Sequence, residues 1–107
     1  MFRLWVDDVR PAPSEDWIWA KTVREARAAI HMYERQMSVD TILISLDHDA
    51  GDYAEDGKDY IDLLNWLEYW KIPDTGYFFH LHSQNPVGVE NMRRIISHNG
   101  WREVYKI

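Results

Sequence analysis

The stretch Thr41-Ile-Leu-Ile-Ser-Leu-Asp-His-Asp-Ala-Gly51 decides how this chain folds. It begins as an apolar run rich in β-branched residues and ends in the charged group Asp47-His48-Asp49. A continuous apolar run of this length is typical of a strand that is buried on both faces of a parallel sheet. Such a strand shows its polar residues only at its carboxyl end, which is where open α/β sheets bind their ligands. We therefore predict a strand over Thr41–Leu46 and a functional site directly after it.

Two further segments have the same form. The run Phe2–Val6 leads into Asp7-Asp8-Val9-Arg10-Pro11, and the run Tyr77–Leu81 leads into His82-Ser83-Gln84-Asn85-Pro86. The carboxyl ends of parallel strands meet at one edge of a sheet, so polar residues that follow three such strands are brought together. One shared site is therefore a simpler interpretation than three separate ones.

Length and composition indicate one globular domain over residues 1–107. The chain is 46% hydrophobic and 14% aromatic, which disfavours disorder. Its net charge of −6, without any run of basic residues, disfavours binding to duplex DNA or to anionic membranes. The absence of cysteine excludes disulfides and thiolate metal sites. No apolar run reaches the length of a signal-peptide core or a membrane span, so we expect a soluble cytoplasmic protein.

Capping signals separate the strands. Thr22-x-x-Glu25 is a capping box, and Asn85-Pro86 joins a good N-cap residue to proline at the first helical position. Asn99-Gly100 stops the last helix. In chain order we predict the strand Phe2–Val6, a loop over Asp7–Asp16, a strand over Trp17–Ala20, a helix from Thr22, the strand Thr41–Leu46, an acidic loop over Gly51–Gly57, a helix over Lys58–Trp70, the strand Tyr77–His82, a helix after Asn85 and a final strand over Trp101–Ile107.

Strands that alternate with helices predict an α/β domain with a parallel sheet and right-handed crossovers. About ten residues with two prolines join the first two strands, whereas a parallel crossover usually needs a dozen or more. The chain also stops after its last strand. We therefore expect a five-stranded, doubly wound fold whose first and last helices are reduced or missing.

Side chains along a strand alternate between the two faces of the sheet, which sorts the residues of the three main strands. The apolar set must meet the helices: Phe2, Leu4, Val6, Ile42, Ile44, Leu46, Tyr77, Phe79 and Leu81. The mixed set faces the other way: Arg3, Trp5, Asp7, Leu43, Ser45, Asp47, Phe78, His80 and His82. If the three strands are adjacent, then Asp7, Asp47 and His82 approach one another at the edge of the sheet.

Four carboxylates are expected near that edge: Asp7, Asp8, Asp47 and Asp49. Two like charges about 4 Å apart repel by roughly 4 kcal/mol at an effective dielectric of 20, so the group needs a cation or one member takes a proton. A divalent metal is the simplest relief. Oxygen ligands alone suit Mg, whereas imidazole among the ligands suits Mn, Fe or Zn, so the role of the histidines decides the metal.

Each of these signals also has a structural interpretation. Asp7-Asp8 after a strand is often a turn, and His80-x-His82 is often a polar pair on a half-exposed strand. Arg10 suits a phosphate, but equally a surface charge. Asn85, with Ser83 two residues before it, suits either an anion at the helix start or capping alone. The three motifs together, at the ends of adjacent strands, favour a site.

Three motifs in this order resemble the cyclic-phosphate-processing receiver-like family: Leu4-Trp-Val-Asp-Asp-x-Arg-Pro11, Ile44-Ser-Leu-Asp-His-Asp49 and His80-x-His-Ser-x-Asn-Pro-x-Gly88. The resemblance covers nearly the whole chain. It implies a divergent form of the response-regulator receiver fold, with a flavodoxin-like sheet in the strand order 2-1-3-4-5. It also implies action on cyclic phosphates.

The resemblance assigns roles to single residues. It makes Asp7 and Asp8 the acidic pair that holds a divalent cation in receivers, Asp47 the counterpart of their phosphoacceptor, and Ser83 the counterpart of their switch Ser or Thr. Receivers also carry a lysine at the end of strand five, followed by proline and a helix. Here Lys106 is the second-last residue, which argues against ordinary phosphotransfer signalling. The residues without a receiver counterpart are His48, Asp49, His80, His82 and Asn85.

The sequence thus predicts a metal-dependent phosphoesterase that acts on a cyclic phosphate, in a cyclic nucleotide or at a 2′,3′-cyclic end. The alternative is a receiver-like module that is not an enzyme and binds a protein partner or a cyclic nucleotide without cleaving it. The expected metal is Mg, Mn or Zn. We expect Asp7, Asp8, Asp47 and Asp49 as metal ligands, Asp47, His80 and His82 as catalytic residues, Arg10, Ser83 and Asn85 as phosphate ligands, and His48 as a further candidate.

The face of the sheet that lacks helices raises the question of assembly. It carries large apolar residues such as Trp5, and monomers rarely expose apolar patches of more than a few hundred Å². Either the loop Asp7–Asp16 with Trp17 and Trp19 folds over this face, or a second copy of the chain covers it. On this ground we expect a homodimer, since a two-fold pair is the commonest closed assembly.

Overall fold

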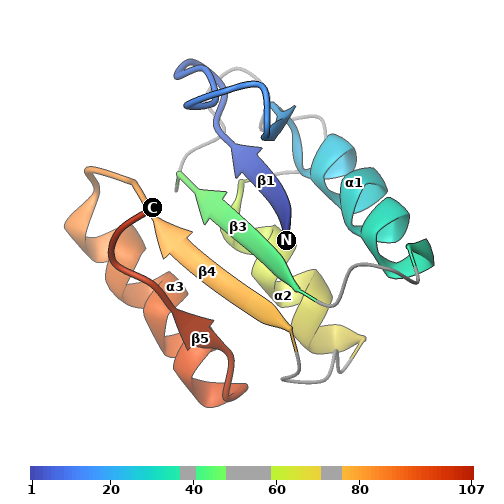
Figure 1. Cartoon of the computed structure of the whole chain (residues 1–107). Helices are drawn as coiled ribbons and strands as arrows, with labels where there is room; N and C mark the ends of the chain where they lie inside the picture. Colours follow the sequence, from blue (N-terminus) through green and yellow to red (C-terminus); the bar gives the residue numbers. More distant parts are fainter. Residues whose placement is uncertain (37–40, 48–58, 71–75) are drawn as a thin grey trace.

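The computed structural model describes residues 1–36, 41–47, 59–70 and 76–107. Its five strands lie parallel in one sheet, in the order β2-β1-β3-β4-β5, which confirms the predicted flavodoxin-like topology (Figure 1). The strands are β1 (Phe2–Val6), β2 (Ile18–Ala20), β3 (Ile42–Leu46), β4 (Tyr77–Leu81) and β5 (Arg102–Glu103).

The register of the central strands brings their carboxyl ends to one level. Val6 of β1 lies beside Leu46 of β3. The ladder continues one residue further, because the Asp47 N–H donates to the Val6 carbonyl at 2.9 Å and the His82 N–H donates to the Leu46 carbonyl at 2.9 Å. Asp7, Asp47 and His82 therefore leave the sheet at the same edge.

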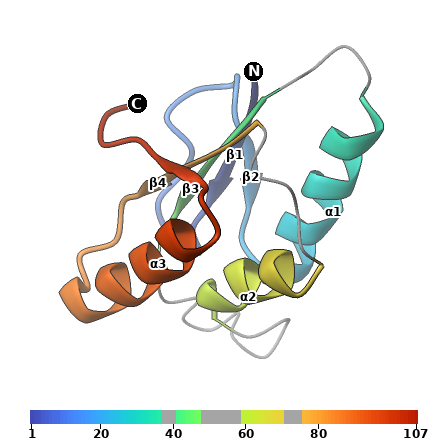
Figure 2. The ribbon, with the colours of Figure 1, turned by 90° about the horizontal axis from the view of Figure 1, so that it is seen from below.

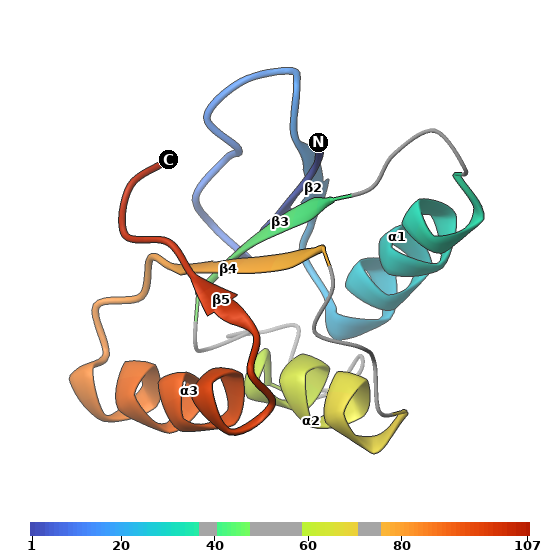
Figure 3. The same cartoon turned by 60° about the horizontal axis from the view of Figure 1, so that its bottom comes forward.

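The three helices of the described residues cover one face of the sheet, as the rule of right-handed crossovers predicts (Figures 2 and 3). They are α1 (Val23–Arg35), α2 (Ile61–Tyr69) and α3 (Pro86–His98). Every residue of β3 is buried, and side chains such as Leu4 and Phe79 are fully enclosed between the sheet and the helices. The apolar set predicted from strand alternation thus lies in the core, except Leu81, which is partly buried and packs against it.

The helix starts agree with the capping signals of the sequence. The Thr22 hydroxyl accepts from the Glu25 N–H at 3.0 Å, and the Glu25 carboxylate accepts from the Thr22 N–H at 3.3 Å, which completes the capping box of α1. The Asn85 side chain accepts from the Gly88 N–H at 3.0 Å, and Pro86 is the first residue of α3. The turn that leads from β4 into α3 is therefore fixed by its own residues.

The opposite face of the sheet is covered in part by the chain itself. The segment 7–17 passes over this face (Figures 2 and 3). The Trp17 ring packs edge-on against the Trp5 ring, with 5.8 Å between the centroids, and the Trp5 indole N–H donates to the Arg10 carbonyl at 2.8 Å. As a result Trp5 is only 7% exposed. Of the two covers expected for this face, the structure shows the loop, and it does not test the homodimer.

The last strand is shorter than the sequence predicts. β5 covers only Arg102–Glu103 and not Trp101–Ile107, so that prediction was wrong. The strand pairs with β4 alone, at two positions, and its Glu103 carboxylate accepts two hydrogen bonds from Arg93 of α3, both at 2.8 Å. A strand at the edge of the sheet lasts only as long as its single partner, and local sequence does not show where that pairing ends.

Other boundaries shift as well. β2 begins at Ile18 rather than at Trp17, β3 at Ile42 rather than at Thr41, and β4 ends at Leu81 rather than at His82. α2 is observed over Ile61–Tyr69, whereas a helix was predicted over Lys58–Trp70. Lys58 and the predicted acidic loop Gly51–Gly57 lie outside the described residues. Within the described part of the chain, no helix has the length and apolar character needed to cross a membrane.

Candidate functional site

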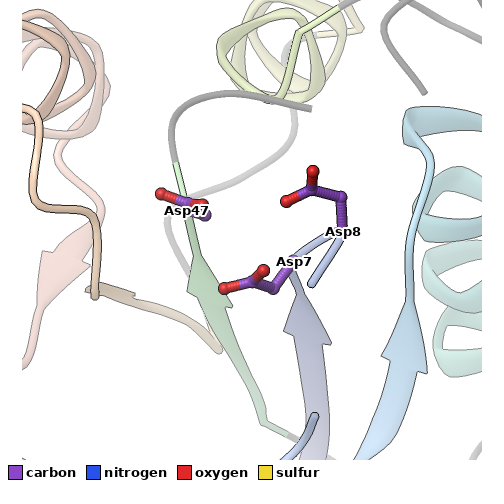
Figure 4. Close-up of side chains that lie close together, drawn as sticks. All are labelled: Asp7, Asp8 and Asp47. Carbon is purple, nitrogen blue, oxygen red and sulfur yellow. The ribbon is translucent and has the colours of Figure 1, made fainter. Parts of the chain in front are cut away.

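Three carboxylates meet where β1 and β3 end (Figure 4). Asp7 and Asp8 follow β1, Asp47 follows β3, and one oxygen of each lies within 4.8 Å of the others. We call these residues the acidic cluster. The structure thus brings together three of the four carboxylates predicted for this edge. The fourth, Asp49, lies outside the described residues, as does His48.

Asp7 is fully buried, and its carboxylate is surrounded by donors. Its Oδ1 accepts the backbone N–H groups of Val9 and Arg10, both at 2.9 Å, and its Oδ2 lies 2.9 Å from Nε2 of His82. Burial by itself would raise the pKa of Asp7. The hydrogen bonds from Arg10, Val9 and His82 outweigh burial and hold that pKa below its ordinary value. Asp7 is therefore ionised at neutral pH.

Asp8 shows the opposite behaviour. Burial raises the pKa of Asp8, and the negative charges of Asp7 and Asp47 raise it further. This is the repulsion that the sequence predicts for crowded carboxylates. A cation placed among the three side chains would relieve it.

The Arg10 guanidinium lies directly against the acidic cluster. Its Nε is 3.3 Å from Oδ2 of Asp7, its Nη2 is 3.6 Å from Oδ2 of Asp47, and its Nη1 donates to the His82 carbonyl at 3.0 Å. Its side chain is 46% exposed, so it reaches the cluster from the solvent side. The sequence led to a phosphate role for Arg10. Its contact with two carboxylates was not foreseen, because the chain reversal after Asp8 that produces this contact has no distinct signal.

A chain of side-chain hydrogen bonds runs from Asp7 along the face without helices. The Nε2 atom of His82 faces Asp7, and its Nδ1 lies 2.7 Å from the Ser45 hydroxyl oxygen. The same oxygen lies 2.8 Å from Nδ1 of His80. The His82 ring also stacks on the Trp5 ring, with 3.9 Å between the centroids and 1° between the planes. Both ring nitrogens of His82 are thus engaged, and in this arrangement His82 orients a carboxylate.

Two residues near this site were not predicted from the sequence as functional candidates. Ser45 is fully buried and is the one polar residue of β3, so a lone serine inside an apolar strand was an available signal. Tyr60 directly precedes α2, and its hydroxyl donates to the Lys21 carbonyl at 2.6 Å. Burial raises the pKa of Tyr60, and the charges of Asp8, Asp7 and Asp47 add to this effect. No local pattern connects Tyr60 with the acidic cluster.

Ser83 and Asn85 use their side chains locally. The Ser83 hydroxyl accepts from the Asn85 N–H at 3.1 Å, and the Asn85 side chain caps α3 through the Gly88 N–H. These are the capping roles that the sequence offered as the alternative to phosphate binding. Contact of either residue with a phosphate stays a prediction.

Comparison with known proteins identifies a family. No curated protein and no solved structure is significantly similar to the chain. The family model described as the cyclic-phosphate processing receiver domain matches residues 2–98. The matched region contains all three carboxylates of the acidic cluster, both histidines of the chain of hydrogen bonds and the whole of α3. With its receiver-type strand order and this match over nearly its full length, the chain belongs to the cyclic-phosphate processing receiver domain family.

Proposed function

We propose that this protein is a metal-dependent phosphoesterase that hydrolyses a cyclic phosphate, in a cyclic nucleotide or at a 2′,3′-cyclic end. The observation that carries the proposal is the acidic cluster, in which one carboxylate oxygen of each residue lies within 4.8 Å of the others, beside Arg10. Membership of the family supports the substrate class. Three carboxylates with a neighbouring guanidinium are the groups that phosphoryl chemistry uses to hold a cation and an anion together.

The donor set of the acidic cluster fits a divalent cation. Carboxylate oxygens are the ligands that Mg and Mn favour, and the raised pKa of Asp8 indicates that its negative neighbours are not fully compensated. In this proposal Asp7, Asp8 and Asp47 hold the cation, and Asp49 is a further candidate. Both nitrogens of His82 are engaged elsewhere, which favours Mg or Mn over Zn. A bound cation supplies Lewis-acid polarisation of a phosphoryl oxygen.

The remaining residues bind and orient the substrate. Arg10 presents a planar set of N–H donors on the solvent side, which matches the oxygens of a phosphate. We assign Ser83 and Asn85, at the start of α3, to the same phosphate, because the N-terminus of a helix favours an anion. His82 holds the Asp7 carboxylate in place, and His80 is the candidate for acid–base help, which is typically worth 10²–10⁴-fold.

A substrate panel tests this proposal. Purified protein is incubated with 3′,5′-cyclic and 2′,3′-cyclic mononucleotides, cyclic dinucleotides and RNA with a 2′,3′-cyclic end, each with Mg, Mn or Zn. Phosphorus NMR detects opening of the phosphate ring. We expect turnover by the wild type with Mg or Mn, and its loss in Asp8→Asn, which keeps the shape of the side chain. Failure to open any substrate with any metal would contradict the proposal.

The second candidate function is binding without cleavage. Arg10 already compensates part of the acidic cluster from within the chain, with Nε 3.3 Å from Asp7 and Nη2 3.6 Å from Asp47. This contact favours a module that holds a cyclic nucleotide or a protein partner at the same edge. Tight binding of a cyclic nucleotide in calorimetry, with no change in its phosphorus spectrum, would support this function over the enzyme.

A further inference from the structure

One buried hydroxyl joins the two histidines of β4. Ser45 lies near the carboxyl end of β3 and has no exposed surface. Its Oγ is 2.7 Å from Nδ1 of His82 and 2.8 Å from Nδ1 of His80. A hydroxyl has one hydrogen to donate, so at most one of these two nitrogens accepts from it, and the other must donate to it. The protonation pattern of one ring therefore constrains the other.

Asp7 sets the direction of this chain of hydrogen bonds. Its carboxylate accepts two backbone N–H groups and is ionised, so the His82 Nε2 atom, 2.9 Å from Oδ2, carries a hydrogen. The Arg10 guanidinium lies 3.3 Å from the same Asp7 oxygen and already compensates its charge, and the His82 side chain is only 8% exposed. His82 therefore needs no second positive charge at this buried position, which favours its neutral ring. A neutral ring with hydrogen on Nε2 has a bare Nδ1. Ser45 therefore donates to His82 and accepts from the Nδ1–H group of His80.

The same sequence of bonds leaves one nitrogen free. With its hydrogen on Nδ1, a neutral His80 has a lone pair on Nε2. Within the described part of the chain this Nε2 makes no hydrogen bond, and the ring is only partly buried. Burial also lowers the pKa of His80, which favours the neutral ring. His80 and His82 therefore carry their hydrogen on different ring nitrogens, Nδ1 in His80 and Nε2 in His82, although they lie two residues apart.

We propose that Ser45 is a positioning residue, which holds His80 in the tautomer with hydrogen on Nδ1 and thereby keeps its Nε2 as an acceptor for a ligand hydroxyl. His82 is committed to Asp7 and does not contact the ligand. The ligand class is a hydroxyl-bearing one, such as the sugar of a nucleotide. This ligand role rests on the proposed function, whereas the tautomer of His80 does not.

NMR of the imidazole nitrogens tests the tautomer directly, in isotope-labelled protein without metal or substrate. Long-range correlation spectra distinguish a protonated nitrogen from a bare one, and His80→Gln and His82→Gln assign the two signals. We expect His80 to be protonated at Nδ1 and His82 at Nε2. The exposed His31, which packs edge-on against Trp66, and the exposed His98 lie on helices. Among the described residues neither ring makes a hydrogen bond, so both serve as internal references for rings that no hydrogen bond holds in one tautomer.

Two substitutions of Ser45 separate its hydroxyl from its bulk. Ser45→Ala should abolish the Nδ1–H signature of His80 and return that ring to the spectrum of the references, while His82 keeps its hydrogen on Nε2. Ser45→Thr keeps a hydroxyl and should keep the wild-type pattern. A wild-type His80 protonated at Nε2 and bare at Nδ1 would overturn the proposal, as would an unchanged His80 in folded Ser45→Ala. If Ser45→Ala does not fold, the spectra of wild type and Ser45→Thr decide.

The ligand role has its own readout. Once a cyclic phosphate is found that the protein opens, Ser45→Ala should lower kcat by about 10- to 100-fold, the range typical of residues that orient a catalytic group. Ser45→Thr should restore most of this loss. If Ser45→Ala loses the Nδ1–H signature of His80 but keeps a normal kcat, His80 has no role in binding the ligand. The tautomer assignment would still hold. Absence of any turnover would instead count against the proposed function, because the NMR result needs no substrate.

Discussion

Asp7 connects all parts of the candidate site. Its two oxygens accept from the Val9 and Arg10 N–H groups and face His82, and the Arg10 guanidinium lies 3.3 Å from the same carboxylate. Because it is buried, it has little freedom to turn when a ligand arrives. Asp8 and Asp47 are less buried, and they are the members of the acidic cluster that can adjust around a cation.

Asp47→Asn tests the cation at the residue scale, since it removes one charge and keeps the size of the side chain. A divalent ion that binds only the folded protein raises its melting temperature by mass action. We expect millimolar Mg or Mn to raise the melting temperature of the wild type, and the variant to lose most of this increment and most activity. Without metal the variant should melt no lower than the wild type, because one repulsive charge is gone. Thermal unfolding with and without EDTA measures both effects. If Mg, Mn and Zn all leave the melting temperature of the wild type unchanged, the proposed metal site is wrong.

Arg10→Gln tests competition between the guanidinium and a metal. The contacts of Arg10 with Asp7 and Asp47 place a positive charge against two proposed ligands, so its removal should strengthen metal binding. Exposed ion pairs are worth up to about 1 kcal/mol each, so we expect roughly a three- to tenfold lower Kd for Mn. Calorimetric titration with Mn measures the change, and Arg94→Gln on the exposed side of α3 is the control. Weaker Mn binding in Arg10→Gln would show that Arg10 supports the site rather than competing for it.

His82→Ala should have two consequences that His31→Ala and His98→Ala lack. It removes the partner of the Asp7 carboxylate and the ring that stacks on Trp5, so both activity and melting temperature should fall. We expect activity to drop by about 10²-fold or more, within the range typical of lost acid–base or orienting groups. His31→Ala and His98→Ala change exposed side chains on helices and should retain both properties. Equal activities in the three variants would return His82 to a purely structural role.

The partly buried His80 also predicts how the stability of the fold depends on pH. Burial lowers the pKa of His80, so below about pH 6.5 the unfolded chain takes up a proton that the folded protein excludes, and the free energy of unfolding falls. The loss continues down to the folded pKa of His80. The lowered pKa of Asp7 adds a further loss below its ordinary value of 3.8. Urea unfolding between about pH 7.5 and about pH 5 should therefore show a smaller loss in His80→Gln than in the wild type. An identical loss of stability in the wild type and in His80→Gln would contradict the lowered pKa of His80.

At the scale of strands and helices, an element's boundaries could be predicted from the sequence where nearby residues determine them, and not where contacts with distant residues do. β3 was predicted to within one residue because an uninterrupted apolar run has only one stable environment, the centre of the sheet. The starts of α1 and α3 were predicted from their N-caps, Thr22 and Asn85, because the capping residues lie within the helix and the turn before it. β5 was predicted too long, because its extent depends on pairing with β4 across the sheet. Local sequence shows an apolar run and a helix cap, but not how far one strand pairs with another.

The candidate site divides in the same way. Asp7, Asp47 and His82 were predicted to meet because strand alternation and strand ends are enough to place them. The bridge from Ser45 to both histidines needs the register of β3 against β4, in which Ser45 lies beside His80. Alternation put Ser45 on the correct face, but only the pairing of the strands gives it a partner. A buried polar residue on a central strand is thus a better pointer to a site than its residue type suggests.

At the scale of the whole molecule, handedness determines which face of the sheet needs a cover. Three crossovers that advance in the same direction put α1, α2 and α3 on one face, as predicted (Figures 2 and 3). The other face carries Trp5 and Leu43, and both are only 7% exposed in the single chain. The loop 7–17 therefore covers much of this face within one chain, although a second copy of the chain was expected to cover it.

The association state follows from this cover. Because the loop 7–17 already shields Trp5, we expect a monomer of about 12.8 kDa by light scattering at micromolar concentration. Trp5→Glu should then unfold or strongly destabilise the monomer, by roughly 3 kcal/mol or more, because a charge would replace a ring packed between Trp17 and His82. Trp70→Glu, at a position that is 62% exposed, is the matched control and should change the stability little. A mass near twice the monomer value, with Trp5→Glu giving stable monomers, would instead establish the homodimer and make the loop a part of its interface.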